Sequence, residues 1–382
     1  MPYDYKAKYS TDGVTFTALT NVQNISVKLG REKQLDAYNA SSCTIEIRYP
    51  TGFASPIAAL KTGTYMKVES PNQIGGVGGC FFGRIRDVQV RYGIPYSGGV
   101  GVADYLTISC EGFFAAVARM NGNNYSMLSN TPQDQLSASN AFTGTTGAYL
   151  RPSGANPLMA ATTVSGTWGD WYNQLLTTLN GRMWDSNLID EIKVVSPFYQ
   201  NPQNPAYVVT FSDNANPVTQ YIYDQIDFTS YADNFWTQAA ITPEGLSTVT
   251  VTASGATAPY RTYSLNSLNS TTGQATDFGN YLVSLYGTSQ FRISSISCLM
   301  EASSKNSDLD ILADQSPASY MGMRIVVVFR GTTFNCIIEG VTITATPESS
   351  RYTFTLSSAE QNNYFILNDT VFGTLDYNKL GY

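Results

Sequence analysis

Short segments in which apolar and polar residues alternate recur along this chain, and they constrain its fold more than any other feature. In one of them, Cys43, Ile45 and Ile47 are separated by Thr44 and Glu46. Successive side chains of a β-strand point to opposite faces, so this alternation indicates a strand with one buried face. Gly-rich stretches such as IGGVGG and YSGGVG separate the segments and are typical of turns. The pattern predicts a mainly β fold.

The predicted elements fall into three regions. We expect an N-terminal β-domain over residues 1–120, a middle region over 121–219 and a C-terminal β-domain over 220–382, because a chain of this length suffices for two or three domains. The middle region begins with a stretch rich in Asn, Ser, Thr and Gly at 121–166, which we interpret as an extended loop or arm. Apolar residues at helical spacing predict helices over 167–179 and 277–286.

A faint internal repeat links the two β-domains. Residues 78–90 (GGCFFGRIRDVQV) align without gaps with residues 331–343 (GTTFNCIIEGVTI). Each copy follows one predicted strand and precedes, after a turn, another alternating strand. This recurring order indicates a duplicated antiparallel unit, the alternative being chance similarity between two alternating strands. The expected fold class is therefore mainly β, with two related antiparallel β-barrel or sandwich-like domains and a helix-containing middle segment.

The chain contains no histidine, which excludes hydrolases with a Ser-His-Asp triad, Cys-His proteases and His-ligated zinc or haem. It has 22 Lys and Arg against 29 Asp and Glu, a net charge of −7, and no basic patch, which argues against a nucleic-acid binder. We interpret the densest acidic group, Asp185, Asp190 and Glu191, as a solvated helix face or turn. No catalytic, cofactor or metal motif is recognised, so we expect a protein that is not an enzyme and holds no cofactor.

The cysteine and tryptophan residues are expected to have structural roles. The five cysteines show no metal-ligand spacing and lie mostly in predicted strands, where a free thiol behaves as a small hydrophobe. We expect reduced thiols at Cys43, Cys80, Cys110, Cys298 and Cys336. Trp168 and Trp171 lie one turn apart on the expected helix. Their expected role is core packing, and a sugar-stacking platform is the alternative.

Two parts of the sequence resemble minor tail proteins of long-tailed bacteriophages. Residues 27–117 are similar to the N-terminal β-domain of that family, through the pair Gly30 and Arg31 and the segments SCTIEIRYPTG, FFGRIRDVQV and YLTISCEGFFAAVARM. Near the C-terminus, EGVTITATPESSRYTFTLS is followed by FILNDTVFGTLDYNKLGY. The latter is similar to the ending W-x-L-[GN]-D-x-x-x-G-x-L-D of tail proteins from phages that infect actinobacteria, with Phe365 where that family often has Trp.

The resemblance implies a structural protein of the tail tip, or baseplate, that acts as a tail hub. Hub proteins carry two related β-barrels per chain, and three chains close a ring that matches the six-fold tail tube. The implied partners are further copies of the chain, in a trimer, and other phage tail proteins: the tube or distal-tail protein, the tape measure protein and tip fibres. The ring would connect the tube to the tip and take part in host attachment and DNA delivery.

The implied location is the virion, after synthesis and assembly in the host cytoplasm. No sequence-specific nucleic acid is expected as a partner. No integral membrane segment is expected either, because no apolar run approaches the ~20 residues that a membrane helix needs.

Three alternatives stay open from the sequence. A distal-tail adaptor ring of six copies would be favoured by one barrel per subunit. A host-glycan-binding adhesin would use Trp and Tyr platforms, with residues 121–166 as a binding segment. A glycosidase-like enzyme would need two carboxylates about 5–10 Å apart across a cleft.

The last residues of the chain, 365–382, are too apolar to stay free in solvent. We expect this tail to dock on its own domain or on a neighbouring subunit, and we expect its removal to destabilise the fold or the assembly. The candidate subunit-interface residues are Phe365, Leu367, Phe372, Leu375, Tyr377 and Tyr382.

Overall fold

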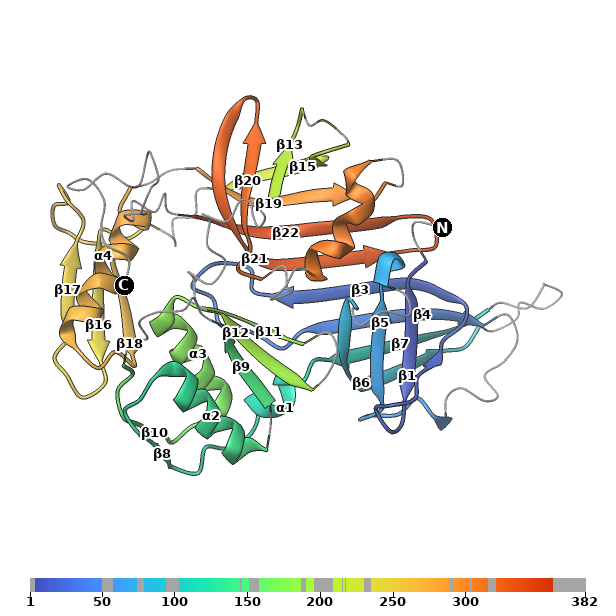
Figure 1. The fold of residues 1–382 in the computed structure, drawn as a ribbon, viewed down its shortest axis with the longest axis horizontal. Coiled ribbons are helices and arrows are strands. Elements are labelled where there is room, and N and C mark those ends of the chain that lie inside the picture. Colours follow the sequence, from blue (N-terminus) through green and yellow to red (C-terminus); the bar gives the residue numbers. More distant parts are fainter. Residues whose placement is uncertain are drawn as a thin grey trace.

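The computed structural model describes most of the chain: residues 4–49, 58–73, 79–93, 103–144, 146–150, 158–186, 190–195, 209–214, 216, 218–229, 235–288, 291–301, 304–314 and 321–359. Fourteen strands form one continuous sheet, and three smaller sheets of two or three strands lie around it. In Figure 1 the sheet extends from the blue strands of the N-terminal part to the red strands of the C-terminal part without a break. The mainly β prediction is confirmed.

The first β-unit comprises six strands that pair in the order β1-β5-β6-β7-β4-β3. Alternating burial along them, as in β4 and β7, places one face of each strand on the core. Their bounds are β1 (Lys6–Ser10), β3 (Val22–Gly30), β4 (Ser42–Tyr49), β5 (Tyr65–Glu69), β6 (Phe81–Arg91) and β7 (Asp104–Glu111), and β2 (Thr17–Ala18) extends the edge at β1.

The second β-unit pairs its strands in the order β13-β20-β21-β22-β19-β15. Numbered along the chain within each unit, both units follow the same order, 1-4-5-6-3-2. One difference is that β1 runs antiparallel to β5, whereas β13 runs parallel to β20. The bounds are β13 (Val209–Ser212), β15 (Gln225–Thr229), β19 (Arg292–Leu299), β20 (Arg324–Phe329), β21 (Thr332–Ala345) and β22 (Ser350–Ser358), and β14 (Tyr221–Ile222) extends the edge at β13.

The two β-units share a bulge at the same place. The ladder between β6 and β7 shifts register after Ile85 and leaves Arg86 without an opposite residue. The ladder between β21 and β22 shifts after Ile338 and leaves Glu339 without one. These positions are equivalent in the sequence repeat. Because a bulge is a specific local feature of a strand pair, its recurrence supports a true duplication beyond general β similarity.

A glycine before each of these strand pairs repeats as well. The N–H of Gly63, at φ +90°, donates to the carbonyl of Ile85 at 2.8 Å, and the N–H of Gly322, at φ +75°, donates to the carbonyl of Ile338 at 2.8 Å. Both glycines adopt the left-handed conformation that favours this residue type. The tight turn into the strand pair is therefore part of the repeated unit.

The middle of the chain folds around the helix that the sequence predicts. Its elements are α1 (Phe114–Ala118), β8 (Tyr125–Met127), α2 (Pro132–Thr143), β9 (Thr146–Leu150), β10 (Thr162–Val164), α3 (Trp168–Leu179), β11 (Arg182–Asp185) and β12 (Glu191–Val195). Thr167 and Asp170 form a capping box at the start of α3. Trp168 and Trp171 are 0% and 3% exposed, which confirms their packing in a core.

The segment 121–166, predicted as an extended loop or arm, instead contains the helix α2. The side chain of Thr131 accepts a hydrogen bond from the backbone of Asp134, Pro132 occupies the first turn, and Gly144 ends the helix at φ +66°. The prediction missed this helix because its apolar stripe is weak, and Leu136 is its main apolar anchor in the core that surrounds α3. Tertiary packing therefore stabilises a helix that periodicity alone does not reveal.

A further small sheet is inserted between β15 and β19. Its strands are β16 (Gln238–Pro243), β17 (Val249–Thr252) and β18 (Thr262–Ser267), and α4 (Thr272–Tyr286) packs on it, at the left of Figure 1. The helix expected over 277–286 is thus confirmed, with an earlier start at the N-cap Thr271. The short 3-10 helices are η2 (Pro71–Gln73) and η5 (Lys305–Asp314).

The five cysteines are free and buried, as expected for structural thiols. None of the helices in the described ranges has the length and hydropathy needed to cross a membrane. The three-part division at residues 120 and 219 stays a prediction. Strand β13, which precedes residue 219, pairs with β20 in the second β-unit.

Candidate functional site at the junction of the two β-units

The two β-units are joined by a strand pair that spans more than 300 residues of sequence. Strand β3 of the first unit runs antiparallel to the second half of β21, with Gly30 opposite Gly340 and Ile25 opposite Ala345. Figure 1 shows β3 lying beside β21 at the centre of the molecule. On the core side of this pair, Val27 and Ile343 are 0% and 1% exposed. The junction is therefore a continuation of the sheet, with a buried apolar face.

Gly30 allows the two backbones to approach at the end of this strand pair. It adopts φ +80°, and a Cβ atom at this position would lie 2.3 Å from the carbonyl oxygen of Glu339. The next residue, Arg31, donates its backbone N–H to the same oxygen at 2.9 Å. Any side chain at position 30 would therefore overlap the bulge of β21.

The side chain of Glu339 is the centre of a buried ionic cluster. Its Oε2 accepts a hydrogen bond from Arg31 Nε at 2.8 Å and forms an ion pair with Arg31 Nη2 at 2.8 Å. Its Oε1 accepts hydrogen bonds from Arg182 Nη2 and from Ser357 Oγ, both at 2.6 Å. The side chains of Glu339, Arg31 and Arg182 are 0%, 4% and 1% exposed. Because Arg31 follows β3, Glu339 lies on β21 and Arg182 lies on β11, the cluster ties both β-units to the middle of the chain.

The charges of this cluster compensate the cost of burying them. Burial by itself disfavours the carboxylate of Glu339, but the guanidinium groups of Arg182 and Arg31 and the hydrogen bond from Ser357 outweigh it and lower the pKa of Glu339 to about 2. The carboxylate raises the pKa of Arg182 against the opposing effect of burial. The cluster is therefore fully ionised near neutral pH, and removing one charge would leave the others unpaired.

The segment that follows Arg31 connects the junction to the inserted small sheet. The side-chain amide of Gln34 donates to Tyr281 Oη at 2.6 Å and to Asn180 Oδ1 at 3.2 Å, and its carbonyl accepts from the hydroxyl of Tyr286. Both tyrosines lie on α4, whereas Asn180 ends α3. This short segment thus contacts both the middle of the chain and the helix of the inserted sheet.

The acidic group that the sequence singles out does not form a solvated helix face. Asp185 is buried at the end of β11, and its carboxylate accepts the backbone N–H groups of Ser41 at 2.7 Å and Phe114 at 2.5 Å. Burial raises the pKa of Asp185 despite these hydrogen bonds. Asp190 pairs with Arg84 at 2.5 Å. The prediction is wrong because the tertiary structure brings two backbone N–H donors to Asp185, although the local sequence indicates an exposed position.

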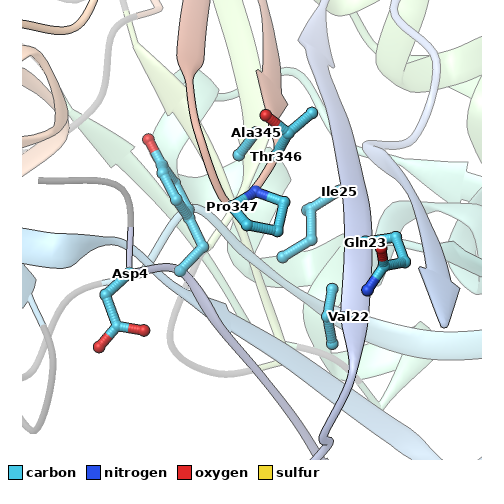
Figure 2. A pocket seen from close by; sticks show the side chains of 8 residues that line it. Asp4, Val22, Gln23, Ile25, Ala345, Thr346 and Pro347 are labelled. Carbon is cyan, nitrogen blue, oxygen red and sulfur yellow. The ribbon is translucent and has the colours of Figure 1, made fainter. Parts of the chain in front are cut away.

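A small recess lies at the other end of the β3–β21 pair. Figure 2 shows Pro347 facing Ile25 and Val22, with Asp4 directed away from them. Its volume is about 190 Å³, below the ~300–1,000 Å³ typical of ligand pockets. Beside it, the hydroxyl of Tyr5 is within 2.7 Å of the Tyr352 hydroxyl. The recess is a dimple between packed strands.

The contacts around the junction hold the two β-units and the middle of the chain together, and the charged groups there form ion pairs with one another. Within the ranges that the structure describes, no three His, Cys, Asp or Glu side chains are grouped to hold a metal ion. The candidate interface residues of the C-terminal tail lie outside the described residues, as follows: Phe365, Leu367, Phe372, Leu375, Tyr377 and Tyr382.

Sequence reasoning missed the Glu339 cluster. The available signal is a single charged residue in the largely apolar strand segment CIIEGVTI. A charge at such a position requires a buried partner. Both partners, Arg31 and Arg182, are remote in sequence, so only the fold identifies them.

Solved structures of other proteins share this fold. A 43 kDa tail protein of prophage MuSo2 from Shewanella oneidensis superimposes with a TM-score of 0.60, 10% identity, and coverage of 93% of this chain and 97% of the other. A tail protein from Neisseria meningitidis MC58 superimposes with a TM-score of 0.62 and 11% identity, over 93% of this chain and 96% of the other. The chain has the fold of bacteriophage tail proteins.

A component of the type VI secretion system from E. coli shares the fold as well. It superimposes with a TM-score of 0.52 and 10% identity over 93% of this chain and 77% of its own, and it is described as structurally similar to the T4 bacteriophage tail proteins gp27 and gp5. No protein-family model and no curated protein matches the sequence. The similarity is thus carried by the fold and extends over nearly the whole chain.

Proposed function

We propose that this protein is a structural component of a bacteriophage tail tip, a tail hub or minor tail protein whose ring connects the tail tube to the tip and takes part in host attachment and DNA delivery. The observation that carries the proposal is the pair of equivalent β-units in one sheet, within a chain that shares the tail-protein fold over 93% of its length. Two units per chain give six units in a trimer, which suits a six-fold tube. A heterologous closed ring is a common solution for such symmetry.

The proposed partners follow from this role. They are further copies of the chain and neighbouring tail proteins: the tube or distal-tail protein, the tape measure protein and tip fibres. The proposed location is the virion, after assembly in the host cytoplasm. The similarity to tail proteins of phages that infect actinobacteria stays a prediction from the segment 365–382.

Two measurements test the proposal. Light scattering and negative-stain imaging of the purified chain should give a ring of three subunits with six-fold appearance. Antibody labelling of purified phage particles should place the protein at the tail tip. A ring of six copies would favour the distal-tail adaptor, and absence of the protein from particles would contradict a virion role.

The glycan-binding alternative is weakened by the positions of the aromatic side chains. Trp168 and Trp171 are buried in the core around α3, so they cannot stack on a sugar. The adhesin alternative would need a platform elsewhere, and binding of the purified chain to host cell-wall glycans in an array tests it directly.

We keep the docking role of the tail 365–382 as part of this proposal. A chain truncated after residue 364 should lose ring formation or melt at a lower temperature. A full-length chain with alanine at both Phe365 and Phe372 should show the same defect in weaker form, and alanine at the polar Asn378 is the matched control. A truncated chain that is soluble, stable and assembles normally would contradict the docking role.

A further inference from the structure

The two β-units differ in how their equivalent edges are used. The second half of β21 pairs on one edge with β22 and on the other with β3. In the described part of the chain, the equivalent residues 87–91 of β6 pair with β7 alone. Likewise β15, which is equivalent to β3, pairs with β19 alone. Among the described residues, each chain therefore has one edge on β6 and one edge on β15 without a neighbouring strand.

We propose that β15 of one copy pairs with residues 87–91 of β6 in a second copy, antiparallel, in the way that β3 pairs with β21 within the chain. Edges without a neighbouring strand favour strand addition, because their backbone N–H and C=O groups have no ladder to join. The contact is heterologous: each copy contributes β15 to one neighbour and residues 87–91 of β6 to the other. The inference rests on the proposed ring only for the number of copies; the strand pairing itself follows from the repeat.

The register of the proposed pair follows from the ladders. From the shared bulge, opposite residues can be followed from one strand to the next across each unit. The same number of steps ends at Ile25 on β3 in the first unit and at Ile226 on β15 in the second. The equivalent positions passed on the way are Ile108 and Phe354, then Ile45 and Ile296. Within the chain, Ser26 lies opposite Thr344 and Val27 opposite Ile343.

Transferring these positions to the open edges fixes three opposite pairs. The repeat makes Thr344, Ile343 and Thr342 equivalent to Arg91, Val90 and Gln89. The resulting pairs are Arg91 with Asp227, Val90 with Phe228, and Gln89 with Thr229.

The side chains match this register, which follows from the strand ladders and from the equivalence of the two bulges. Arg91 and Asp227 are both exposed and carry opposite charges, and in the described ranges neither forms an ion pair. Asp227 accepts a hydrogen bond from Ser295 Oγ at 2.8 Å, and the Arg91 guanidinium lies 5.2 Å from the ring centroid of Tyr105. Opposite charges facing each other across two strands stabilise the pairing.

The apolar side chains match as well. Val90 and Phe228 are half-buried, and both pack against the edge of the large core. Their equivalents in the closed junction, Ile343 and Val27, are 1% and 0% exposed. Pairing the two open edges would bury Val90 and Phe228 to a similar degree. A register shift by one residue would place Arg91 opposite Phe228 and lose both matches.

Charge reversal tests the ionic pair in the full-length chain. Arg91→Glu and Asp227→Arg, each alone, should weaken self-association by roughly 5- to 30-fold per interface, because each places like charges opposite each other. The double variant carries the pair in reversed order on every copy and should recover to within about threefold of the wild type. Sedimentation velocity across a concentration series measures this, and circular dichroism checks that each variant is folded.

The matched control is Glu244→Lys, an exposed charge in the turn after β16. It should leave self-association unchanged. Single variants that associate like the wild type, or a double variant that does not recover, would overturn the ionic pair.

Disulfide formation tests the register directly. Gln89→Cys combined with Thr229→Cys places two thiols opposite each other between copies, within reach of a disulfide. Mild oxidation should therefore give covalent dimers and larger species on a non-reducing gel. The pair Asp87→Cys with Thr229→Cys is displaced by two residues and should cross-link at least fivefold less. The five native cysteines are buried, so they add little background.

The outcomes separate this inference from the proposed function. A ring that forms without the Gln89–Thr229 cross-link overturns the edge pairing and leaves the tail-tip role intact. A chain that cross-links as expected but is absent from phage particles supports the edge pairing and contradicts the tail-tip role. Sedimentation of the wild type begins at about 1 μM. A wild-type chain that stays monomeric at 100 times this concentration, together with a Gln89→Cys/Thr229→Cys variant that forms no cross-link there, overturns the edge pairing.

Discussion

The two β-units have the same strand order and the same bulge, yet equivalent side chains have different surroundings. Val341 and Ile343 are each 1% exposed beneath the β3–β21 pair. Val88 and Val90, at the equivalent positions of β6, are only half-buried. The difference comes from the strand beside them: β21 has β3, and β6 has no such neighbour in the described chain. One architecture thus serves once as an internal junction and once as an open edge.

The bulge shows the same contrast. Glu339 is 0% exposed and bound by two arginines, whereas Arg86, its equivalent, is exposed. A buried charge needs partners, and an exposed charge is satisfied by water. The cost of a substitution should therefore follow the surroundings of each residue and differ between equivalent positions.

The largest effect is expected at Glu339. Glu339→Gln removes the charge that pairs both arginines, so the free energy of unfolding should fall by about 3–5 kcal/mol. The equivalent change in the first unit, Arg86→Gln, should alter it by no more than about 0.5 kcal/mol. Urea denaturation followed by fluorescence measures both. Equal effects at the two positions would contradict the assigned difference between the bulges.

Acid should weaken the closed junction through the same residue. The pKa of Glu339 is lowered in the folded state, from an ordinary value of 4.5 to about 2, so its contribution is fully present above about pH 4.5. It is lost as the pH falls towards 2, which amounts to about 3 kcal/mol. Urea denaturation between pH 5 and pH 2 should show this loss in the wild type. Glu339→Gln, which cannot titrate at this position, should lack that component of the pH dependence.

The close approach at Gly30 should also be sensitive. Gly30→Ala adds a Cβ atom that meets the carbonyl of Glu339, in addition to the strain of a positive φ, so it should cost about 3 kcal/mol. Gly63→Ala has a positive φ but nothing within 4 Å of the added atom, and it should cost roughly 1–2 kcal/mol. Thermal unfolding of the two variants compares them. A Gly63 variant less stable than the Gly30 variant would refute the role of this contact.

The smallest difference between equivalent positions is expected for two valines. Val341→Ala should destabilise the fold by about 2 kcal/mol, because it leaves a cavity under the paired strands. Val88→Ala removes a half-buried side chain and should cost about 1 kcal/mol in the isolated chain. Urea midpoints provide the comparison, and similar costs at both positions would indicate that the β6 edge is already covered.

Much of the fold could be predicted from local sequence. Alternation identified strands such as β4 and β22, the helical spacing of Trp168 and Trp171 identified α3, and the repeat identified the relation between β6 and β21. These signals work because strand and helix periodicities place apolar side chains on one face. The helix α2 escaped prediction because Leu136 is its main apolar anchor.

The candidate site could be predicted only in part. The pair Gly30 and Arg31 was noted as a motif, but its partner Glu339 lies 308 residues from Arg31. Likewise Asp185 gave no local sign that it would accept the backbone N–H groups of Ser41 and Phe114. Such contacts depend on the path of the chain in space, which local sequence patterns do not reveal.

By itself, the sequence determined that this protein is mainly β and lacks histidine chemistry, and it indicated that one strand unit recurs in the two β-domains, because alternation, gapless similarity and composition are local properties. The tertiary structure decided which edges of the two β-units are covered. It did so by bringing β3 against β21 and leaving 87–91 of β6 and the outer edge of β15 without partners in the described chain. Equivalent residues then acquire different burial and charge partners, because pairing between remote strands depends on the three-dimensional arrangement of the backbone.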